Sequence, residues 1–170
     1  MDKKFTVGLI VSNHFGVLNR VAGLYAKRGF NIDSLAVGTT ENPKYSRMTI
    51  VSSGDVDIQK QVIKQLQKLH DVKKIFMFDN GCTVSVEHLL IKISVESGNN
   101  TKASGLINSY GGKVRDFGAD FITAEVTGET CIIDDFIKSC EAFDILELCR
   151  SGSISMACGT ENMLSVKKFN

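Results

Sequence analysis

The sequence has no tryptophan, a single proline and a formal net charge of only +1. A charge so close to zero provides no electrostatic attraction for nucleic acid or for an anionic membrane surface. Its apolar runs are short, since none approaches the roughly 18 residues that a membrane-spanning helix requires. The first residues also lack the apolar stretch of a secretory signal peptide. We therefore expect a cytoplasmic protein that binds neither nucleic acid nor membrane.

The sequence also lacks the usual motifs of catalysis and metal binding. Its three histidines are isolated, and no C-x-x-C, G-x-G-x-x-G or G-x-S-x-G motif occurs. Four of the five cysteines are spaced by nine residues: Cys131, Cys140, Cys149 and Cys158. Nine residues are two and a half helical turns, so successive thiols would face opposite sides of a helix. The spacing favours free thiols, with a metal site or disulfides as the alternatives, and we expect no catalytic residue and no metal ligand.

The hydrophobic pattern instead divides the chain into two halves with the same order of elements. The first half predicts strands over 5–11, 31–37, 45–52 and 72–78, and helices over 15–28 and about 58–69. The second half predicts strands over 89–95, 114–117, 121–127, 145–149 and 154–156, and helices over 100–110 and from about 130 to 140. The order βαββαβ, repeated with one extra strand, predicts an α+β fold with two ferredoxin-like domains. The turn signal Asp79-Asn80-Gly81 divides them into 1–79 and 80–170.

The most informative segment is the predicted strand, turn and helix over residues 7–31. The start of a helix presents free backbone N–H groups and a positive dipole end, which together can hold a carboxylate. Asn13 either caps this helix or binds the carboxylate or ammonium group of a ligand. Gly16 is expected near the third helical position, where glycine costs up to about 1 kcal/mol relative to alanine. The close approach of a ligand or another backbone would explain a glycine there, and the alternative is a glycine with no such role.

Asn31 begins the second predicted strand, at the opposite end of the sheet from the turn that holds Asn13. If two such sheets pair antiparallel, Asn31 of one chain can meet Asn13 and Gly16 of its partner. The alternative is that Asn31 is simply a turn residue after Gly29.

These motifs resemble the regulatory (small) subunit of acetolactate synthase over nearly the whole chain. In the first half the matching motifs are Asn13-x-x-Gly16, Leu18-x-Arg20-Val21, Arg28-Gly29-Phe30-Asn31-Ile32-x-Ser34-Leu35 and Ser46-Arg47-Met48-Thr49-Ile50. In the second half they are Glu87-x-Leu89-x-Ile91-Lys92, Glu125-Val126-Thr127-Gly128 and Arg150-Ser151-Gly152. Each motif is weak alone, and their common order makes the resemblance specific.

The resemblance implies that the first domain is an ACT domain that forms a homodimer and binds valine or another branched-chain amino acid at the pairing interface. The effector residues that it implies are Asn13, His14, Phe15, Gly16, Val17, Leu18, Asn31 and Ile32. It also implies a catalytic (large) subunit as partner, which carries thiamine diphosphate, magnesium and FAD, whereas this chain carries no cofactor. The chain would then raise the activity of that subunit and make it subject to feedback inhibition.

Two other functions stay open from the sequence. A stand-alone ACT-type amino-acid sensor would use the same site without binding an enzyme. An enzyme with an unrecognised active site would need catalytic residues that no motif in the sequence indicates.

Overall fold

The computed structural model describes residues 3–78, 81–95, 99–160 and Met163. It divides into two compact units. The first comprises the residues up to Val84 together with those from Ser153 onward, and the second runs from Ser85 to Gly152. Within the described residues, no helix combines the length and apolar character needed to cross a membrane.

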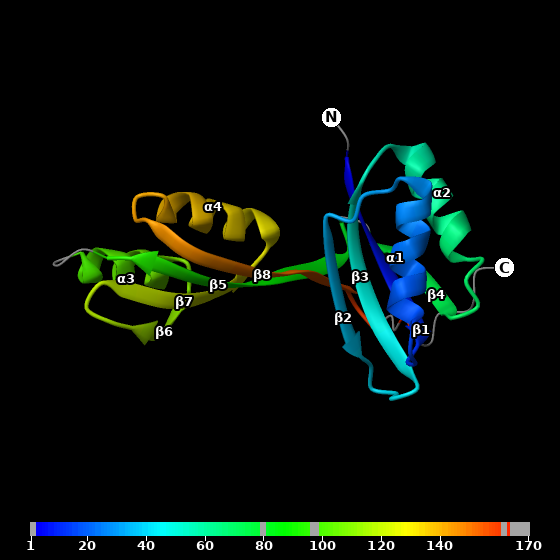
Figure 1. Cartoon of the computed structure of the whole chain (residues 1–170), viewed down its shortest axis with the longest axis horizontal. Helices are drawn as coiled ribbons and strands as arrows, with labels where there is room; N and C mark the ends of the chain where they lie inside the picture. Colours follow the sequence, from blue (N-terminus) through cyan, green and yellow to red (C-terminus); the bar gives the residue numbers. More distant parts are fainter. Residues whose placement is uncertain (1–2, 79–80, 96–98, 161–162, 164–170) are drawn as a thin grey trace. The chain divides into compact units, whose positions relative to one another are not determined.

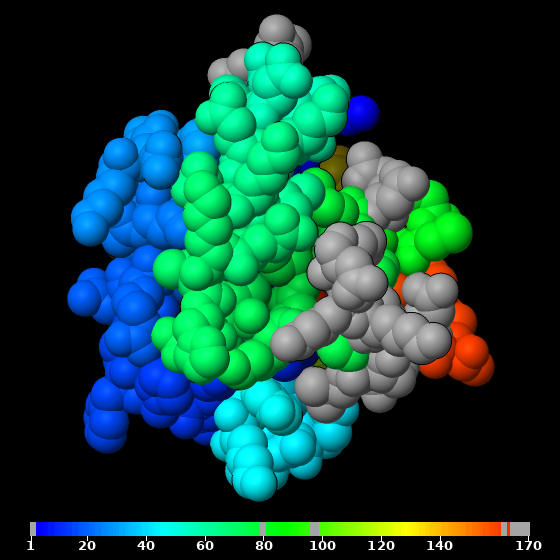
Figure 2. Space-filling model, turned by 90° about the vertical axis from the view of Figure 1, so that its right-hand side faces the viewer, coloured from blue at the N-terminus to red at the C-terminus, as the bar shows by residue number. Residues whose placement is uncertain are grey.

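The first unit is a four-stranded sheet with two helices on one face (Figure 1). Its elements are β1 (Lys4–Ser12), α1 (Val17–Arg28), β2 (Ser34–Thr39), β3 (Tyr45–Ser53), α2 (Val56–Leu66) and β4 (Val72–Phe78). The strand order is β2-β3-β1-β4, and each neighbouring pair is antiparallel. In Figure 2, which views this unit from the side of α2, the blue residues of α1 lie beside the green residues of α2.

Alternation along the central strand explains why the helices cover one face of this sheet. Val7, Leu9 and Val11 of β1 are fully buried against the apolar stripe of α1, which includes Val21 and Tyr25. The strand residues between them face the other way. α1 ends at Gly29, whose φ of 68° is the left-handed conformation typical of a helix C-terminus.

The opposite face of this sheet is covered in part by Met163. Met163 packs in a small apolar cluster with Ile10 and Phe78. Gly8 lies beneath them, where a Cβ would approach a ring carbon of Phe78 to 2.7 Å. The absence of a side chain at residue 8 therefore allows the ring to lie flat on the strand.

The second unit repeats the architecture. Its elements are β5 (Thr83–Ser94), α3 (Asn100–Ser109), β6 (Lys113–Phe117), β7 (Phe121–Gly128), α4 (Thr130–Cys140) and β8 (Ile145–Ala157), and the first residues of β5 and the last residues of β8 belong to the first unit. The strand order is β6-β7-β5-β8. Its core joins alternate strand residues to the helices; the fully buried members include Leu89, Ile91, Ile93, Ala124, Ile107, Ile133 and Phe136. The prediction of two ferredoxin-like βαββαβ halves is confirmed.

Two details of the prediction differ from the structure. The sequence predicted two strands separated by a turn at Arg150-Ser151-Gly152, whereas β8 is one strand from Ile145 to Ala157. The three residues stay in the strand because Arg150 pairs with Glu87 and Ser151 Oγ accepts a hydrogen bond from the His88 N–H at 3.0 Å. The helix predicted over 15–28 begins at Val17, because Gly16 adopts a left-handed conformation.

The compact units have bounds of their own, and the predicted domains 1–79 and 80–170 stay a prediction. The predicted boundary, between residues 79 and 80, lies outside the described residues. The segment after Gly152 belongs to the first unit, since the Arg47 guanidinium donates to the Ser155 carbonyl and the Ser153 N–H donates to Ser34 Oγ at 3.4 Å. Contacts between residues more than a hundred positions apart leave no local signal in a sequence.

Candidate functional site

The turn between β1 and α1 is built around the backbone of Gly16. Gly16 is the N-cap residue of α1 with φ 80°, and no side chain caps this helix. A Cβ at this position would meet only the Arg20 side chain, at 3.5 Å. The positive φ, rather than crowding, therefore explains the glycine. The prediction that Gly16 lies near the third helical position was wrong by three positions, and the expectation of a nearby ligand is not required to account for the glycine.

Asn13 does not cap α1, so the capping alternative was wrong. Its side-chain amide donates to the Pro43 carbonyl at 3.0 Å, and its backbone N–H donates to the Lys44 carbonyl at 2.8 Å. These bonds hold the turn against the β2–β3 connection. Because no side chain makes a capping hydrogen bond at the start of α1, its first N–H groups lie beside Gly16 without the partner that Asn13 would have supplied.

His14 fixes the turn from its other side through Asp71, which lies between α2 and β4. His14 Nε2 is 2.9 Å from Asp71 Oδ1, and Nδ1 is 3.1 Å from the Phe15 carbonyl oxygen. The imidazole therefore links the turn to the α2–β4 connection through Asp71.

Asp71 also binds Arg20 of α1, with 2.6 Å between Arg20 Nε and Asp71 Oδ2. Partial burial alone would raise the pKa of Asp71, but the hydrogen bond and charge of Arg20, with the charge and hydrogen bond of His14, lower it below its ordinary value. The backbone carbonyl of Asp71 accepts the Ser12 N–H at 2.9 Å. One residue therefore ties together the end of β1, the turn and the first turn of α1.

The remaining turn residues present apolar surface. Phe15 is 101% exposed and Leu18 is 44% exposed, whereas Val17 between them is buried in the core. A single exposed apolar side chain is ordinary on a protein surface, so only the two side chains together indicate a contact surface. Phe15 and Leu18 therefore offer an apolar wall beside the open start of α1.

Asn31 and Ile32 lie at the other end of the sheet from this turn. Residue 12 pairs with Tyr45 of β3, whereas Ser34 at the start of β2 pairs with Val51. The Asn31 amide donates to Asp33 Oδ1 at 2.5 Å, and Ile32 packs against the core. The structure therefore does not bring Asn31 to Asn13 within one chain. β2 is an edge strand, so its outer backbone groups face away from the sheet.

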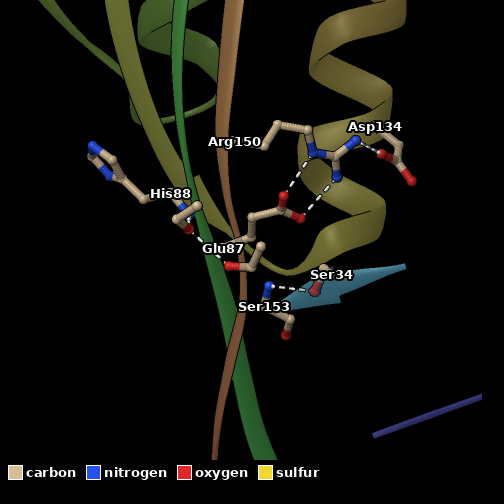
Figure 3. Close-up of polar contacts among 8 residues, drawn as sticks. Ser34, Glu87, His88, Asp134, Arg150 and Ser153 are labelled. Carbon is tan, nitrogen blue, oxygen red and sulfur yellow. Dashed lines mark hydrogen bonds and ion pairs between the residues drawn. The ribbon is translucent and has the colours of Figure 1, made fainter. Parts of the chain in front are cut away.

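The sequence analysis did not find Asp71, and it also missed a buried ion-pair group in the second unit (Figure 3). Glu87, 4% exposed, accepts two hydrogen bonds from Arg150, from Nε at 2.6 Å and from Nη2 at 2.8 Å. Arg150 Nη1 also donates to Asp134 of α4 at 2.8 Å. The Glu87 hydrogen bond, the Asp134 hydrogen bond and both charges raise the pKa of Arg150 against the opposing effect of burial. Glu87 lies two positions before Leu89 in the same strand, so both side chains are on the core face of the sheet. A carboxylate on that face indicates that it has a charged or hydrogen-bonding partner there.

The five cysteines carry free thiols, and only Cys140 is buried. Burial raises the pKa of the Cys140 thiol to about 11. Among the described residues, no three histidine, cysteine or acidic side chains gather closely enough to hold a metal ion.

Comparison with known proteins matches both halves of the chain. Residues 7–74 match the model of the ACT domain of acetohydroxyacid synthase small subunits, and residues 86–159 match the model named small subunit of acetolactate synthase. The first half is therefore an ACT domain, as the resemblance implied.

Full-length relatives give the same result. A probable acetolactate synthase small subunit of Methanothermobacter thermautotrophicus is 38% identical over 92% of this chain and 94% of its own. The acetolactate synthase small subunit of Bacillus subtilis is 37% identical over 97% of this chain and 96% of its own. The crystal structure of a Thermotoga maritima acetolactate synthase small subunit superposes with a TM-score of 0.86 and 31% identity, covering 94% of this chain and 99% of that one.

Proposed function

Because the chain belongs to the family of acetolactate synthase small subunits, we propose that it raises the activity of a catalytic subunit and makes that activity inhibitable by a branched-chain amino acid. The observation that carries the proposal is the uncapped start of α1 beside Gly16, within the residues that match the ACT domain model. The proposal includes a non-catalytic role for this chain and a cytoplasmic location.

The effector site that we propose is shared by two copies of the chain. β2 is an edge strand parallel in direction to β1, since both pair antiparallel with β3. If two β2 strands pair antiparallel, the start of one lies beside the end of the other, so Asn31 of one copy approaches the Asn13–Gly16 turn of the second. The N–H groups at the start of α1 bind the ligand carboxylate, and the Asn31 amide offers an acceptor to its ammonium group.

The side chain of the effector is selected by the apolar wall of Phe15 and Leu18. Burial of an isopropyl group contributes about 2 kcal/mol. Each charge-assisted hydrogen bond to the carboxylate contributes about 1.5–3 kcal/mol. Together they exceed the roughly 4–5.5 kcal/mol that sensing at about 0.1–1 mM requires. Valine fits this balance, and leucine and isoleucine are the competing ligands.

The chemistry belongs to the partner. In the proposal, the catalytic subunit holds thiamine diphosphate, magnesium and FAD and condenses two pyruvates, or pyruvate with 2-oxobutyrate, with loss of carbon dioxide. This chain binds no cofactor and acts by changing which conformation of the catalytic subunit is favoured. An effector bound between two copies of the chain changes their relative arrangement only if it binds one arrangement more tightly than the other.

Asp71 is the residue that we propose to couple the effector turn to the rest of the first unit. It contacts His14 and Arg20 on the turn and α1, yet it belongs to the connection between α2 and β4. Movement of the turn on ligand binding therefore strains these bonds and is transmitted to β4.

Two measurements test the proposal. The chain should co-purify with the catalytic subunit of acetolactate synthase from the same organism. Calorimetry with valine, leucine and isoleucine on the isolated chain should show binding of at least one, while alanine, which lacks the branched side chain, binds more weakly. Binding without co-purification would support a stand-alone sensor instead, and binding of none of the three would remove the effector site.

A further inference from the structure

Two cysteines that are far apart in the sequence lie opposite one another in the first unit. Cys82 immediately precedes β5 and Cys158 immediately follows β8, and the Cys158 N–H donates to the Cys82 carbonyl with 2.9 Å between nitrogen and oxygen. Both residues belong to the same compact unit, and both thiols are free and exposed.

The backbone hydrogen bond sets the separation of the two side chains. β5 and β8 are neighbours in their sheet, and the start of one lies beside the end of the other, so the pairing is antiparallel. Residues that are hydrogen-bonded opposite one another in such a pair have Cα atoms about 5.5 Å apart and side chains on the same face. Disulfide-linked cysteines have Cα atoms about 4.4–6.8 Å apart, so the Cα separation of this pair is compatible with a disulfide. Their Cβ atoms must be about 3.5–4.5 Å apart, so the two side chains move slightly toward each other when the bond forms.

We propose that Cys82 and Cys158 form a reversible disulfide, and that this pair is a thiol–disulfide exchange site for low-molecular-weight disulfides such as glutathione disulfide. One cysteine thiolate attacks a sulfur of the oxidant, forms a mixed disulfide and releases one glutathione thiolate. The second cysteine thiolate then attacks the protein sulfur of that mixed disulfide and displaces the second glutathione. The two protein thiols lose two electrons and two protons, and the oxidant is reduced to two thiols.

The other cysteines lack the features that this chemistry needs. Cys140 is buried in the second core, out of reach of a dissolved oxidant. Cys131 and Cys149 are exposed, and Cys131 directs its thiol toward the carboxylate of Glu129 at 3.8 Å. Cys131 and Cys149 are exposed thiols outside the proposed pair, so they serve as controls for general thiol reactivity.

The disulfide would fix the end of β8 to the start of β5. The same end of β8 carries Ser155, whose carbonyl binds Arg47, and the described residue Met163 follows it against Phe78. Oxidation would therefore hold Ser155 and the end of β8 beside the sheet of the first unit, and reduction would release that constraint.

The test is oxidation of the folded, fully reduced chain with glutathione disulfide, followed by digestion without reductant and mass spectrometry. We expect a peptide that links Cys82 to Cys158, at least about tenfold more abundant than glutathione adducts on either residue, because the second step is intramolecular. Cys131 and Cys149 should instead carry persistent glutathione adducts. Adducts on Cys82 and Cys158 without a linked peptide would overturn the proposal, as would links of similar yield among other cysteine pairs.

Variants separate the pair from general thiol reactivity. Cys158→Ser should convert Cys82 into a persistent glutathione adduct, whereas Cys149→Ser should leave the linked peptide unchanged. Since the mapping of the unmodified chain decides the question alone, a poorly folded variant does not prevent the test. A link found only in chains that migrate as dimers in non-reducing denaturing electrophoresis would also contradict an intrachain disulfide.

Discussion

Two substitutions of Gly16 distinguish electrostatic repulsion of the effector carboxylate from a change in the shape of its site. We compare Gly16→Asp with Gly16→Asn, which have nearly the same volume and differ in charge. Gly16 has φ 80°, and asparagine and aspartate are the side chains that tolerate this conformation best. Each substitution therefore costs a similar strain, about 1 kcal/mol of unfolding free energy, and the difference between them reports the ligand carboxylate.

The size of that difference follows from Coulomb's law and one neighbour. Two carboxylates about 5 Å apart in an effective dielectric of about 20 repel by about 3 kcal/mol. Arg20, whose Nη1 would lie 3.5 Å from a Cβ at residue 16, offsets part of this charge. We therefore expect Gly16→Asp to bind valine about thirtyfold more weakly than Gly16→Asn, which corresponds to about 2 kcal/mol.

The assay is calorimetric titration of each variant with valine, together with denaturant unfolding to verify that both variants are folded to the same extent. Gly16→Asn should retain measurable binding. Equal affinities in the two variants would refute the placement of the ligand carboxylate at the start of α1, and undiminished binding by Gly16→Asp would remove the turn from the site altogether.

Three further predictions concern other contacts. Asp71→Asn should weaken valine binding by at least about fivefold in calorimetry. Because the pKa of Asp71 is lowered, its carboxylate stabilises the fold above the pKa of an unfolded aspartate, and this stabilisation is lost as the pH falls through the lowered value. The free energy of unfolding of the variant should therefore depend less on pH in the acid range. Glu87→Gln should lower the unfolding free energy, measured by denaturant titration, by about 2–4 kcal/mol, because it leaves Arg150 without its buried carboxylate. As the control, Glu147→Gln at the exposed pair with Lys92 should change the unfolding free energy little. Gly8→Val should lower thermal stability by about 1–3 kcal/mol, because an aromatic carbon lies 2.7 Å from the Cβ position; an unchanged melting temperature would contradict that packing.

The periodic elements of the fold were predictable from the sequence because their burial is local. The alternation of Leu89, Ile91 and Ile93 and the spacing of Val17, Val21 and Tyr25 follow the geometry of one strand and one helix. The order and the type of the elements in both halves follow from such patterns. The two ferredoxin-like domains could therefore be predicted without knowledge of contacts between distant residues.

The candidate site was less predictable, because its geometry depends on distant partners. Asp71 reaches Arg20 across 51 positions, and Asn13 bonds to Pro43 across 30. Capping by Asn13 was one of two interpretations, because asparagine favours that position, yet the N-cap is Gly16, three residues further on. In β8, the turn residues Ser151 and Gly152 suggested a break, and the partners that keep the strand continuous come from β5.

The central claim is that this chain transmits the presence of a branched-chain amino acid to a catalytic subunit. The most direct test measures acetolactate formation from pyruvate by the catalytic subunit of the same organism, titrated with this chain in the presence and absence of valine. We predict that the chain raises the rate to a plateau and that valine then lowers it, while valine has no effect on the catalytic subunit alone. A rate that is the same with and without the chain, or a plateau that none of the three branched-chain amino acids lowers, would contradict the account.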